Sequence, residues 1–394
     1  MIYKGRVFDG IEYHEMSELS FSPETGKIEY LEDLKKSSSK NEKKDSKFTD
    51  ITFLPGLIDT HIHFCGTESS SLVDWILTPD VMLTIKSVND AQKLLQSGFT
   101  TVRTLGDKVS LEMSKAEKSG ILGGPRIISA GFSLAETGGN DDPKFLSVEN
   151  SKVLSYSYYC DGPWECRKAA RMNLRNGAEV IKVYSSRSFV GGGRIKDEFT
   201  VEELSAISDE AHRAFVKAAS HAYGESAIKS SIDAGFDSIE HGLGLTEELA
   251  EIMKKKNIFY VPTLSAYKNF RENANSYKAQ MIKNHIERDV KIAFNSKVKI
   301  ASGSDYVGSS NEPHGENYHE IVYLSEIIGN KEALIAATSR AAECVGLNNV
   351  GQLKKDFLAD IIAVKGNPLD NSSALKPENI ILVIKRGKIL KNLL

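Results

Sequence analysis

Eight short apolar segments alternate with helical segments through the middle of this chain of 394 residues, and they constrain its fold more than any other feature. Each segment has the length and character of a strand that is buried on both faces. Strands that alternate with helices are typical of βα units on a parallel sheet. The segments are residues 56–64, 100–106, 125–131, 180–185, 217–223, 238–242, 258–264 and 299–305.

The text between these segments carries helix signals. Residues 200–215 read "TVEELSAISDEAHRAF" and place Thr200 and Glu203 at capping-box spacing, which is typical of a helix start. Eight strands in strict alternation favour a closed barrel over an open sheet, and such a barrel needs about 250 residues. We therefore predict an α/β fold with a TIM-type (β/α)8 barrel over residues 54–352.

Both chain ends are rich in strand signals instead. Residues 1–53 read as short strands and turns, and residues 353–394 contain "DIIAV" and "IILVIKRGKIL", which are dense in β-branched side chains. We expect the two ends, 1–53 and 353–394, to pair as a small β-sandwich beside the barrel.

The composition is that of an ordinary globular protein. Hydrophobic residues make up 41% of the chain, and 50 basic against 53 acidic side chains leave a formal net charge of −3. This balance favours neither nucleic acid nor a membrane as a partner. No apolar run is long enough for a signal peptide or a bilayer span. We expect a cytoplasmic homo-oligomer that acts on a small molecule.

Polar side chains stand at the ends of four predicted strands. His61 and His63 share one face of the first strand because successive strand side chains alternate. His221, His241 and Asp305 each close another strand. A single histidine at such a place is more often a hydrogen-bonded structural residue. In barrel enzymes, however, these strand ends line the active-site mouth, so five such side chains predict a metal site.

Lys182 is a sixth candidate, because it lies within the apolar strand segment 180–185. An unpaired ammonium group inside a barrel is costly. One interpretation is a salt bridge with Asp305 or Glu240. The other is that the low-dielectric site lowers the pKa of Lys182, whose amine then reacts with carbon dioxide to give a carbamate that bridges two cations.

The motifs "PGLIDTHIHF", "IKVYS", "ASHAYG", "SIEHG" and "SGSD" resemble, in this order, the metal-ligand motifs of the amidohydrolase superfamily. "GFTTVRTLGD", "HGENYHEI" and "ADIIAVKGNPLDN" are similar to its binuclear branch of Xaa-Pro dipeptidase-like and Xaa-Arg carboxypeptidase-like enzymes, to which imidazolonepropionase is related. The resemblance covers residues 54 to about 350. It implies a metal-dependent hydrolase of amide bonds.

The resemblance also implies a role for each candidate. Tyr223 matches a tyrosine that touches the substrate carbonyl or carboxylate, and Asp305 would take a proton from the attacking water and return it to the leaving amine. Zinc is the expected metal, although manganese, iron or cobalt suit the same ligands. The implied ligands are His61, His63 and Asp305 for a buried ion, His221 and His241 for an exposed ion, and carboxylated Lys182 as the bridge.

The expected substrate is a dipeptide or an N-acyl amino acid. Relatives usually carry a substrate-facing histidine where this chain has Asn140, which donates a hydrogen bond but carries no charge. A substrate carboxylate needs a cation, and Arg187 is the first candidate, followed by Arg194 and His314.

Three alternatives stay open. The same hydroxide would hydrolyse a cyclic amide, a lactone or an aryl amide. Deamination is disfavoured because "HAYGES" places Glu225 four residues after His221, instead of the usual H-x-x-E. A non-catalytic barrel that serves as a scaffold is disfavoured because all six ligand positions are filled.

Overall fold

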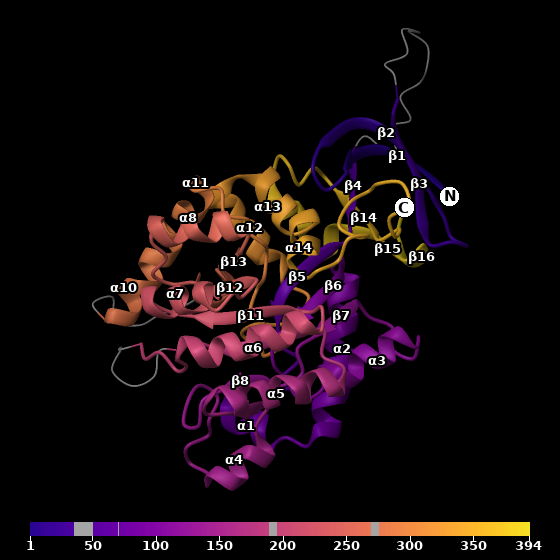
Figure 1. Ribbon diagram of the computed structural model, residues 1–394. Coiled ribbons are helices and arrows are strands. Elements are labelled where there is room, and N and C mark those ends of the chain that lie inside the picture. The colour runs from indigo at the N-terminus through magenta and orange to yellow at the C-terminus, as the bar shows by residue number, and fades with distance from the viewer. Residues whose placement is uncertain (35–49, 70, 189–194, 269–275) are drawn as a thin grey trace, which may run out of the picture.

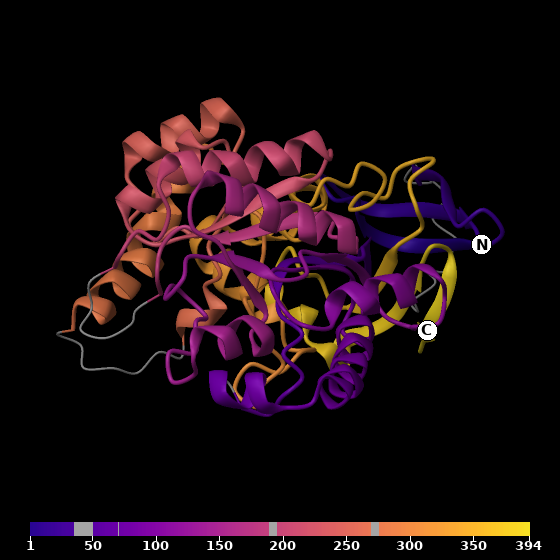
Figure 2. The ribbon, with the colours of Figure 1, turned by 60° about the horizontal axis from the view of Figure 1, so that its bottom comes forward.

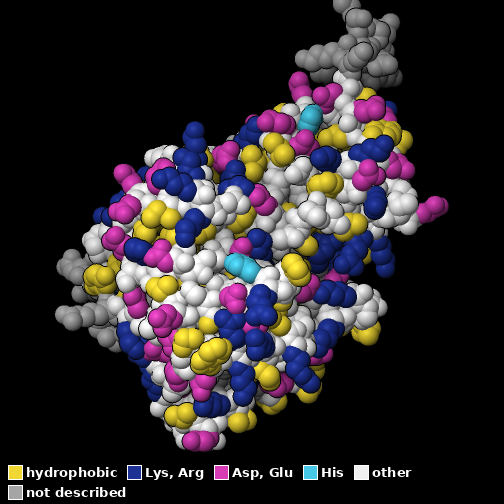
Figure 3. Space-filling view, viewed as in Figure 1, with side chains coloured by type: hydrophobic (Ala, Val, Ile, Leu, Met, Phe, Trp, Pro, Cys, Tyr) yellow, Lys and Arg dark blue, Asp and Glu magenta, His cyan; other side chains and the backbone are white. Residues whose placement is uncertain are grey.

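A computed structural model describes residues 1–34, 50–69, 71–188, 195–268 and 276–394. The chain is an α/β protein, as predicted. Strands from the two chain ends lie side by side at one end of the molecule, and strands flanked by helices make up the rest (Figure 1). Basic and acidic side chains are interspersed over the face shown in Figure 3, as the nearly balanced composition leads one to expect.

The two chain ends meet in one seven-stranded sheet of order β16-β15-β14-β4-β1-β2-β3. Antiparallel pairing of β14 with β4 joins the C-terminal strands to the N-terminal ones. Buried side chains from both ends, among them Phe21, Phe53, Ile361 and Ile384, pack in one cluster. The strands are β1 (Ile2–Phe8), β2 (Tyr13–Ser22), β3 (Lys27–Asp33), β4 (Ile51–Pro55), β14 (Ile361–Lys365), β15 (Ile380–Lys385) and β16 (Lys388–Asn392).

The middle of the chain forms two parallel sheets, of order β5-β6-β7 and β13-β12-β11-β10-β8-β9. Seven of the eight predicted segments contain one of these strands. The short strands β8 and β9 were not predicted, because three residues are too few to show a pattern. The strands are β5 (Leu57–Ile62), β6 (Phe99–Thr104), β7 (Arg126–Ser129), β8 (Ser133–Ala135), β9 (Ser157–Tyr159), β10 (Val180–Tyr184), β11 (Lys217–Ala222), β12 (Ser238–His241) and β13 (Phe259–Val261).

The eighth segment, 299–305, makes only isolated parallel bridges. Ile300 pairs with Tyr260 of β13, and Tyr306 pairs with Ile62 of β5. Gly303 explains how closely this segment approaches β5, because a Cβ atom there would lie 2.8 Å from the Cβ of His61. The segment therefore lies between β13 and β5, at the place where the predicted eighth strand belongs.

Helices cover the outside of the central strands (Figures 1 and 2). Helix α6 begins with the predicted capping box between Thr200 and Glu203, and its Leu204 and Ile207 pack in one cluster with Ile181 of β10. The helices are α1 (Leu72–Leu77), α2 (Asp80–Gln96), α3 (Ser110–Lys118), α4 (Val148–Leu154), α5 (Pro163–Asn176), α6 (Val201–Arg213), α7 (Glu225–Asp233), α8 (Glu247–Lys256), α9 (Ser265–Lys268), α10 (Tyr277–Asn284), α11 (Val290–Asn295), α12 (Tyr318–Ile328), α13 (Asn330–Ala336) and α14 (Ser339–Cys344). Over the described ranges, none of the helices is both long and apolar enough to span a bilayer.

Candidate active site

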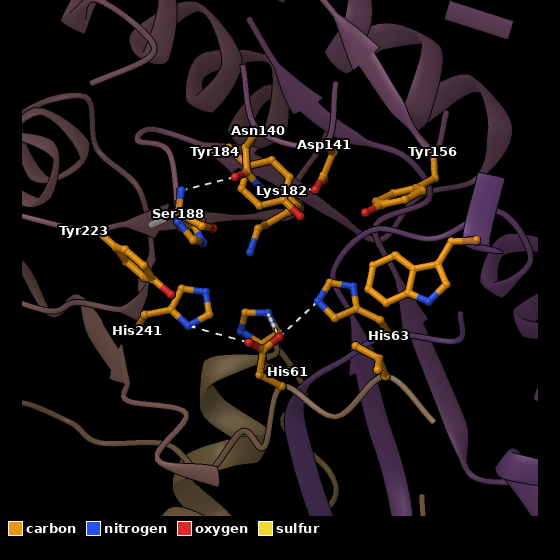
Figure 4. A pocket seen from close by; sticks show the side chains of 14 residues that line it. His61, His63, Asn140, Asp141, Tyr156, Lys182, Tyr184, Ser188, Tyr223 and His241 are labelled. Carbon is orange, nitrogen blue, oxygen red and sulfur yellow. Dashed lines mark hydrogen bonds and ion pairs between the residues drawn. The ribbon is translucent and has the colours of Figure 1, made fainter. Parts of the chain in front are cut away.

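One pocket lies at the carboxyl ends of the central parallel strands (Figure 4). It contains all six residues that the sequence singles out as metal ligands, together with Tyr223 and Asn140. The amine of Lys182 points into the space between the imidazoles (Figure 4). The lining residues are His61, His63, Trp75, Asn140, Asp141, Tyr156, Lys182, Tyr184, Ser188, His221, Tyr223, His241, Asp305 and Val307.

Asp305 is the common neighbour of three of the histidines. Its Oδ1 lies 3.2 Å from Nε2 of His63 and 3.3 Å from Nε2 of His61, and its Oδ2 lies 3.9 Å from Nδ1 of His241. His61, His241 and Asp305 each offer one ligand atom, and these atoms lie within 4.8 Å of one another. Such a group can hold a metal ion.

Two residues of this cluster have a backbone that side chains rarely adopt. The φ angle is +65° at His241 and +60° at Asp305. A left-handed conformation is costly for residues other than glycine, and such strain gathers at functional sites. The chain therefore turns sharply at the ends of β12 and of the eighth segment, just where the ligand atoms enter the pocket.

The buried imidazoles are suited to a metal. Nε2 of His61 and Nε2 of His221 are buried, and neither has a hydrogen-bond partner within the described part of the chain. Burial, and next the charge of Lys182, lowers the pKa of both rings well below the ordinary value. Neutral imidazoles with an unused nitrogen are what metal coordination requires. The donor set therefore fits divalent ions.

Other acceptors set the orientation of three rings. His61 Nδ1 lies 2.8 Å from Glu240 Oε2, His63 Nδ1 lies 2.8 Å from the Gly106 carbonyl, and His241 Nδ1 lies 2.7 Å from Thr263 Oγ1. A hydrogen bond at Nδ1 holds the tautomer that leaves Nε2 for a metal. For His63, burial opposes protonation, but the hydrogen bond to Asp305 and the negative charge of that carboxylate together raise the pKa.

Glu240 and Arg103 form a buried ion pair beneath the site that sequence reasoning missed. Arg103 Nη2 lies 2.7 Å from Glu240 Oε1, and both side chains are almost fully buried. One oxygen of Glu240 thus contacts His61, and the other accepts a hydrogen bond from Arg103. The signal for Arg103 was present, because a charged residue in the apolar strand β6 stands out in the same way as Lys182 in β10.

Lys182 is 1% exposed. Burial lowers its pKa to about 8, against the opposing charges of Glu240 and Asp305. A lysine with a lowered pKa has a larger share of neutral amine near neutral pH. The amine lies over the ring of Tyr184, 5.1 Å from its centroid.

Only some of the predicted substrate-binding residues line the pocket. Tyr223 lines the pocket, and its hydroxyl lies 2.6 Å from that of Tyr267. Asn140 also lines the pocket, but its Oδ1 accepts a hydrogen bond from the Ser188 amide and its Nδ2 donates to Asp141. Asn140 therefore shapes the pocket wall through these two bonds.

Arg187 and His314 are not among the residues that line the pocket. The guanidinium of Arg187 donates to the Gly138 carbonyl and lies 3.6 Å from the carboxylates of both Glu136 and Glu198. His314 is buried and its Nε2 donates to the carbonyl of His63, at 3.0 Å. Arg194, the remaining candidate, lies outside the described residues.

Comparisons with known proteins agree with the resemblance seen in the sequence. The model of the Amidohydrolase family matches residues 52–390. The chain is 31% identical over 373 residues to an ochratoxinase from Aspergillus niger, covering 86% of this chain and 75% of that protein.

Solved structures are similar over nearly the whole chain. The crystal structure of A. niger ochratoxinase has a TM-score of 0.88 and 28% identity, and covers 99% of this chain and 96% of its own. A Xaa-Pro dipeptidase with bound methionine has a TM-score of 0.84 and 31% identity, and covers 99% of both chains. The protein therefore belongs to the amidohydrolase family and is a hydrolase that acts on carbon–nitrogen bonds.

Proposed function

We propose that this protein is a binuclear metal-dependent hydrolase that cleaves the amide bond of a dipeptide or an N-acyl amino acid. One observation carries the proposal: four histidines, one lysine and one aspartate from five segments of the chain line the same pocket. The similarity to a Xaa-Pro dipeptidase and to an ochratoxinase supports an amide as the substrate.

The unused Nε2 atoms of His61 and His221 support the metal centre. Zinc is the first choice, and manganese, iron or cobalt suit the same donors. When bound, two divalent ions supply a water whose pKa is lowered toward neutrality. The proposed ligands are His61, His63 and Asp305 for one ion, His221 and His241 for the other, and carboxylated Lys182 between them.

The carbamate forms on Lys182 by addition of carbon dioxide. The neutral amine attacks the carbon, one N–C bond forms as one C=O π bond opens and leaves its electron pair on oxygen, and the nitrogen gives up one proton to solvent. Burial favours this reaction because it lowers the pKa of Lys182 to about 8. The product is an anion, which suits a site that gathers two cations better than an ammonium group does.

Asp305 and Tyr223 perform the steps that belong to the chain itself. Asp305 takes the proton of the attacking water and then donates it to the leaving nitrogen as the C–N bond breaks. Tyr223 donates a hydrogen bond to the carbonyl oxygen, where negative charge develops, and Tyr267 orients it from 2.6 Å away. One such donor stabilises the transition state by about 2–4 kcal/mol.

The proposal also includes two features of the fold, namely closure of the barrel and a β-sandwich. We propose that the eighth segment closes the central strands into a (β/α)8 barrel over 54–352, which the bridges of Ile300 and Tyr306 support. We also propose that the seven-stranded sheet folds as a small β-sandwich of 1–53 and 353–394, because both ends share one cluster of buried side chains. A homo-oligomer stays a prediction from the sequence.

Metal analysis and a substrate screen test the proposed function. We expect two divalent ions per chain, and hydrolysis of members of a dipeptide library or of a set of N-acyl amino acids. Small lactones, cyclic amides, aryl amides and ochratoxin form the second set, since a relative is named for its action on the last. A pure protein that binds no zinc, manganese, iron or cobalt and hydrolyses nothing would contradict the proposal and favour a scaffold.

A further inference from the structure

We propose that Asp141 and the aromatic side chains around it form a subsite for a protonated amine, so that the enzyme selects substrates with a free amino group over N-acylated ones. This inference rests on the proposed hydrolysis of an amide in the same pocket. The proposed function allows both dipeptides and N-acyl amino acids as substrates, and this inference favours dipeptides. A dipeptide carries an ammonium group next to its scissile carbonyl, and an N-acyl amino acid does not.

Asp141 lies in the wall of the pocket, beside Tyr184 and Tyr156 (Figure 4). Its φ angle is +61°, which is rare for a residue with a side chain. Two contacts stabilise this turn: Asn140 Nδ2 donates to Oδ1 at 3.1 Å, and the Tyr159 hydroxyl donates to the backbone carbonyl at 3.0 Å. A strained backbone that several contacts hold in place is typical of functional positions.

Aromatic side chains bound the carboxylate. Tyr156 and Tyr184 lie beside Asp141 in the wall of the pocket, and the ring of Trp75 lies 6.0 Å from that of Tyr156, centroid to centroid (Figure 4). Tyr156 and Tyr184 are only 5% and 6% exposed, so their positions are set by packing. Aromatic faces around an anion attract alkylammonium groups, through the ring quadrupoles and through direct charge attraction.

Within the described part of the chain, the carboxylate of Asp141 forms no ion pair with a lysine, arginine or histidine. Among the described residues that line the pocket, Lys182 is the only lysine or arginine, and the proposed carbamate would turn it into an anion. Arg187, which follows β10, has its guanidinium beside Glu136 and Glu198 instead. Because a poorly hydrated carboxylate is costly, a substrate ammonium group placed beside Asp141 would be bound favourably.

A matched pair of substrates tests the inference on the metal-loaded enzyme. The pair is an aminoacyl p-nitroanilide and its N-acetyl derivative, which share the scissile bond and differ in the charge of the amine. We expect wild-type kcat/KM to be at least about tenfold higher for the free amine, the size expected when one partner of a close charge pair is lost. In Asp141→Asn we expect this ratio to fall to about threefold or less, through a lower kcat/KM for the free amine alone.

Asp142→Asn is the control. Asp142 is the adjacent acid, its Oδ2 accepts the Gly138 amide at 2.7 Å, and it is not among the residues that line the pocket. We expect this variant to keep the wild-type ratio. Trp75→Leu is a second test variant, because it removes one ring and leaves the carboxylate, and we expect an intermediate ratio. Melting temperature and bound metal are measured for each variant.

Three results would overturn the inference. One is a wild-type enzyme that cleaves both substrates equally well. Another is an Asp141→Asn variant that folds, binds metal and keeps the wild-type ratio. If Asp141→Asn does not fold, an unchanged ratio in Trp75→Leu has the same meaning. A metal-loaded enzyme that hydrolyses no amide at all would instead contradict the proposed function, and the inference would fall with it.

Discussion

Replacing Glu240 by glutamine perturbs the support beneath the proposed metal centre while every proposed ligand residue is kept. Glu240 uses one oxygen for His61 Nδ1, at 2.8 Å, and the other for Arg103 Nη2, at 2.7 Å. Glutamine has a single oxygen. If that oxygen accepts the hydrogen bond of His61 Nδ1, the amide NH2 group faces the guanidinium of Arg103. Two hydrogen-bond donors then face each other with no acceptor between them.

The expected effect has two parts. Arg103 is 0% exposed, so its guanidinium would lose its counter-ion inside the protein, at a cost of about 3–5 kcal/mol of stability. Loss of the carboxylate behind His61 lowers the basicity of that ring, and changes of this kind reduce metal affinity by roughly 10- to 100-fold. That reduction corresponds to about 1.4–2.7 kcal/mol.

Two assays separate these parts. Urea unfolding of the metal-free protein measures stability, and competition with a chelator measures metal affinity. Glu117→Gln is the matched control, because Glu117 on α3 forms a similar buried ion pair with Lys385 of β15, at 2.6 Å, away from the pocket. We expect it to lose stability and to keep its metal affinity.

The comparison between the two variants can refute the reasoning. If Glu240→Gln loses stability as Glu117→Gln does but binds metal like the wild type, Glu240 has no influence on His61 as a ligand. An unchanged stability in both variants would show that neither buried carboxylate stabilises the folded chain.

Three further predictions concern the proposed centre. Lys182→Ala should bind less metal and lose activity, and two ions per chain with full activity would refute the carbamate bridge. Asp305→Asn should retain part of the metal and lose turnover, so an unchanged kcat would remove its proton-transfer role. Burial lowers the pKa of His221, so below pH 6.5 this side chain binds a proton more readily in the unfolded chain than in the folded one; when the pH falls from about 7 to about 5.5, metal-free His221→Gln should therefore lose less melting temperature than the metal-free wild type, and an equal or larger loss would contradict this.

Much of the fold could be predicted from local sequence patterns. Apolar segments of strand length reveal buried parallel strands, because such strands show the same apolar character on both faces. Residues 299–305 were the exception among the eight segments: Gly303 and the left-handed Asp305 let the segment approach β5, but they allow only isolated bridges. The pairing of β4 with β14 places strands from both chain ends in one sheet, while the predicted β-sandwich stays a proposal.

The residues of the pocket wall were much harder to predict from the sequence. Asp141 and Tyr156 come from loops beside the unpredicted strands β8 and β9, and nothing in their local sequence marks them as neighbours of Lys182. Arg187 follows β10 directly, which made it the natural candidate for a substrate carboxylate. Its long side chain instead reaches Glu136 and Glu198, whose closeness only the folded chain shows.

The sequence by itself determined the family, the alternation of strands and helices, the five polar groups at strand ends and the lysine inside a strand, because short stretches of sequence are enough to show each of these. The tertiary structure alone decided which of those groups share a pocket and which charges are already paired, as Glu240 is with Arg103. The physical reason is that electrostatic and hydrogen-bond partners act through space over a few ångströms, and residues more than a hundred positions apart in sequence become neighbours only when the strands are assembled.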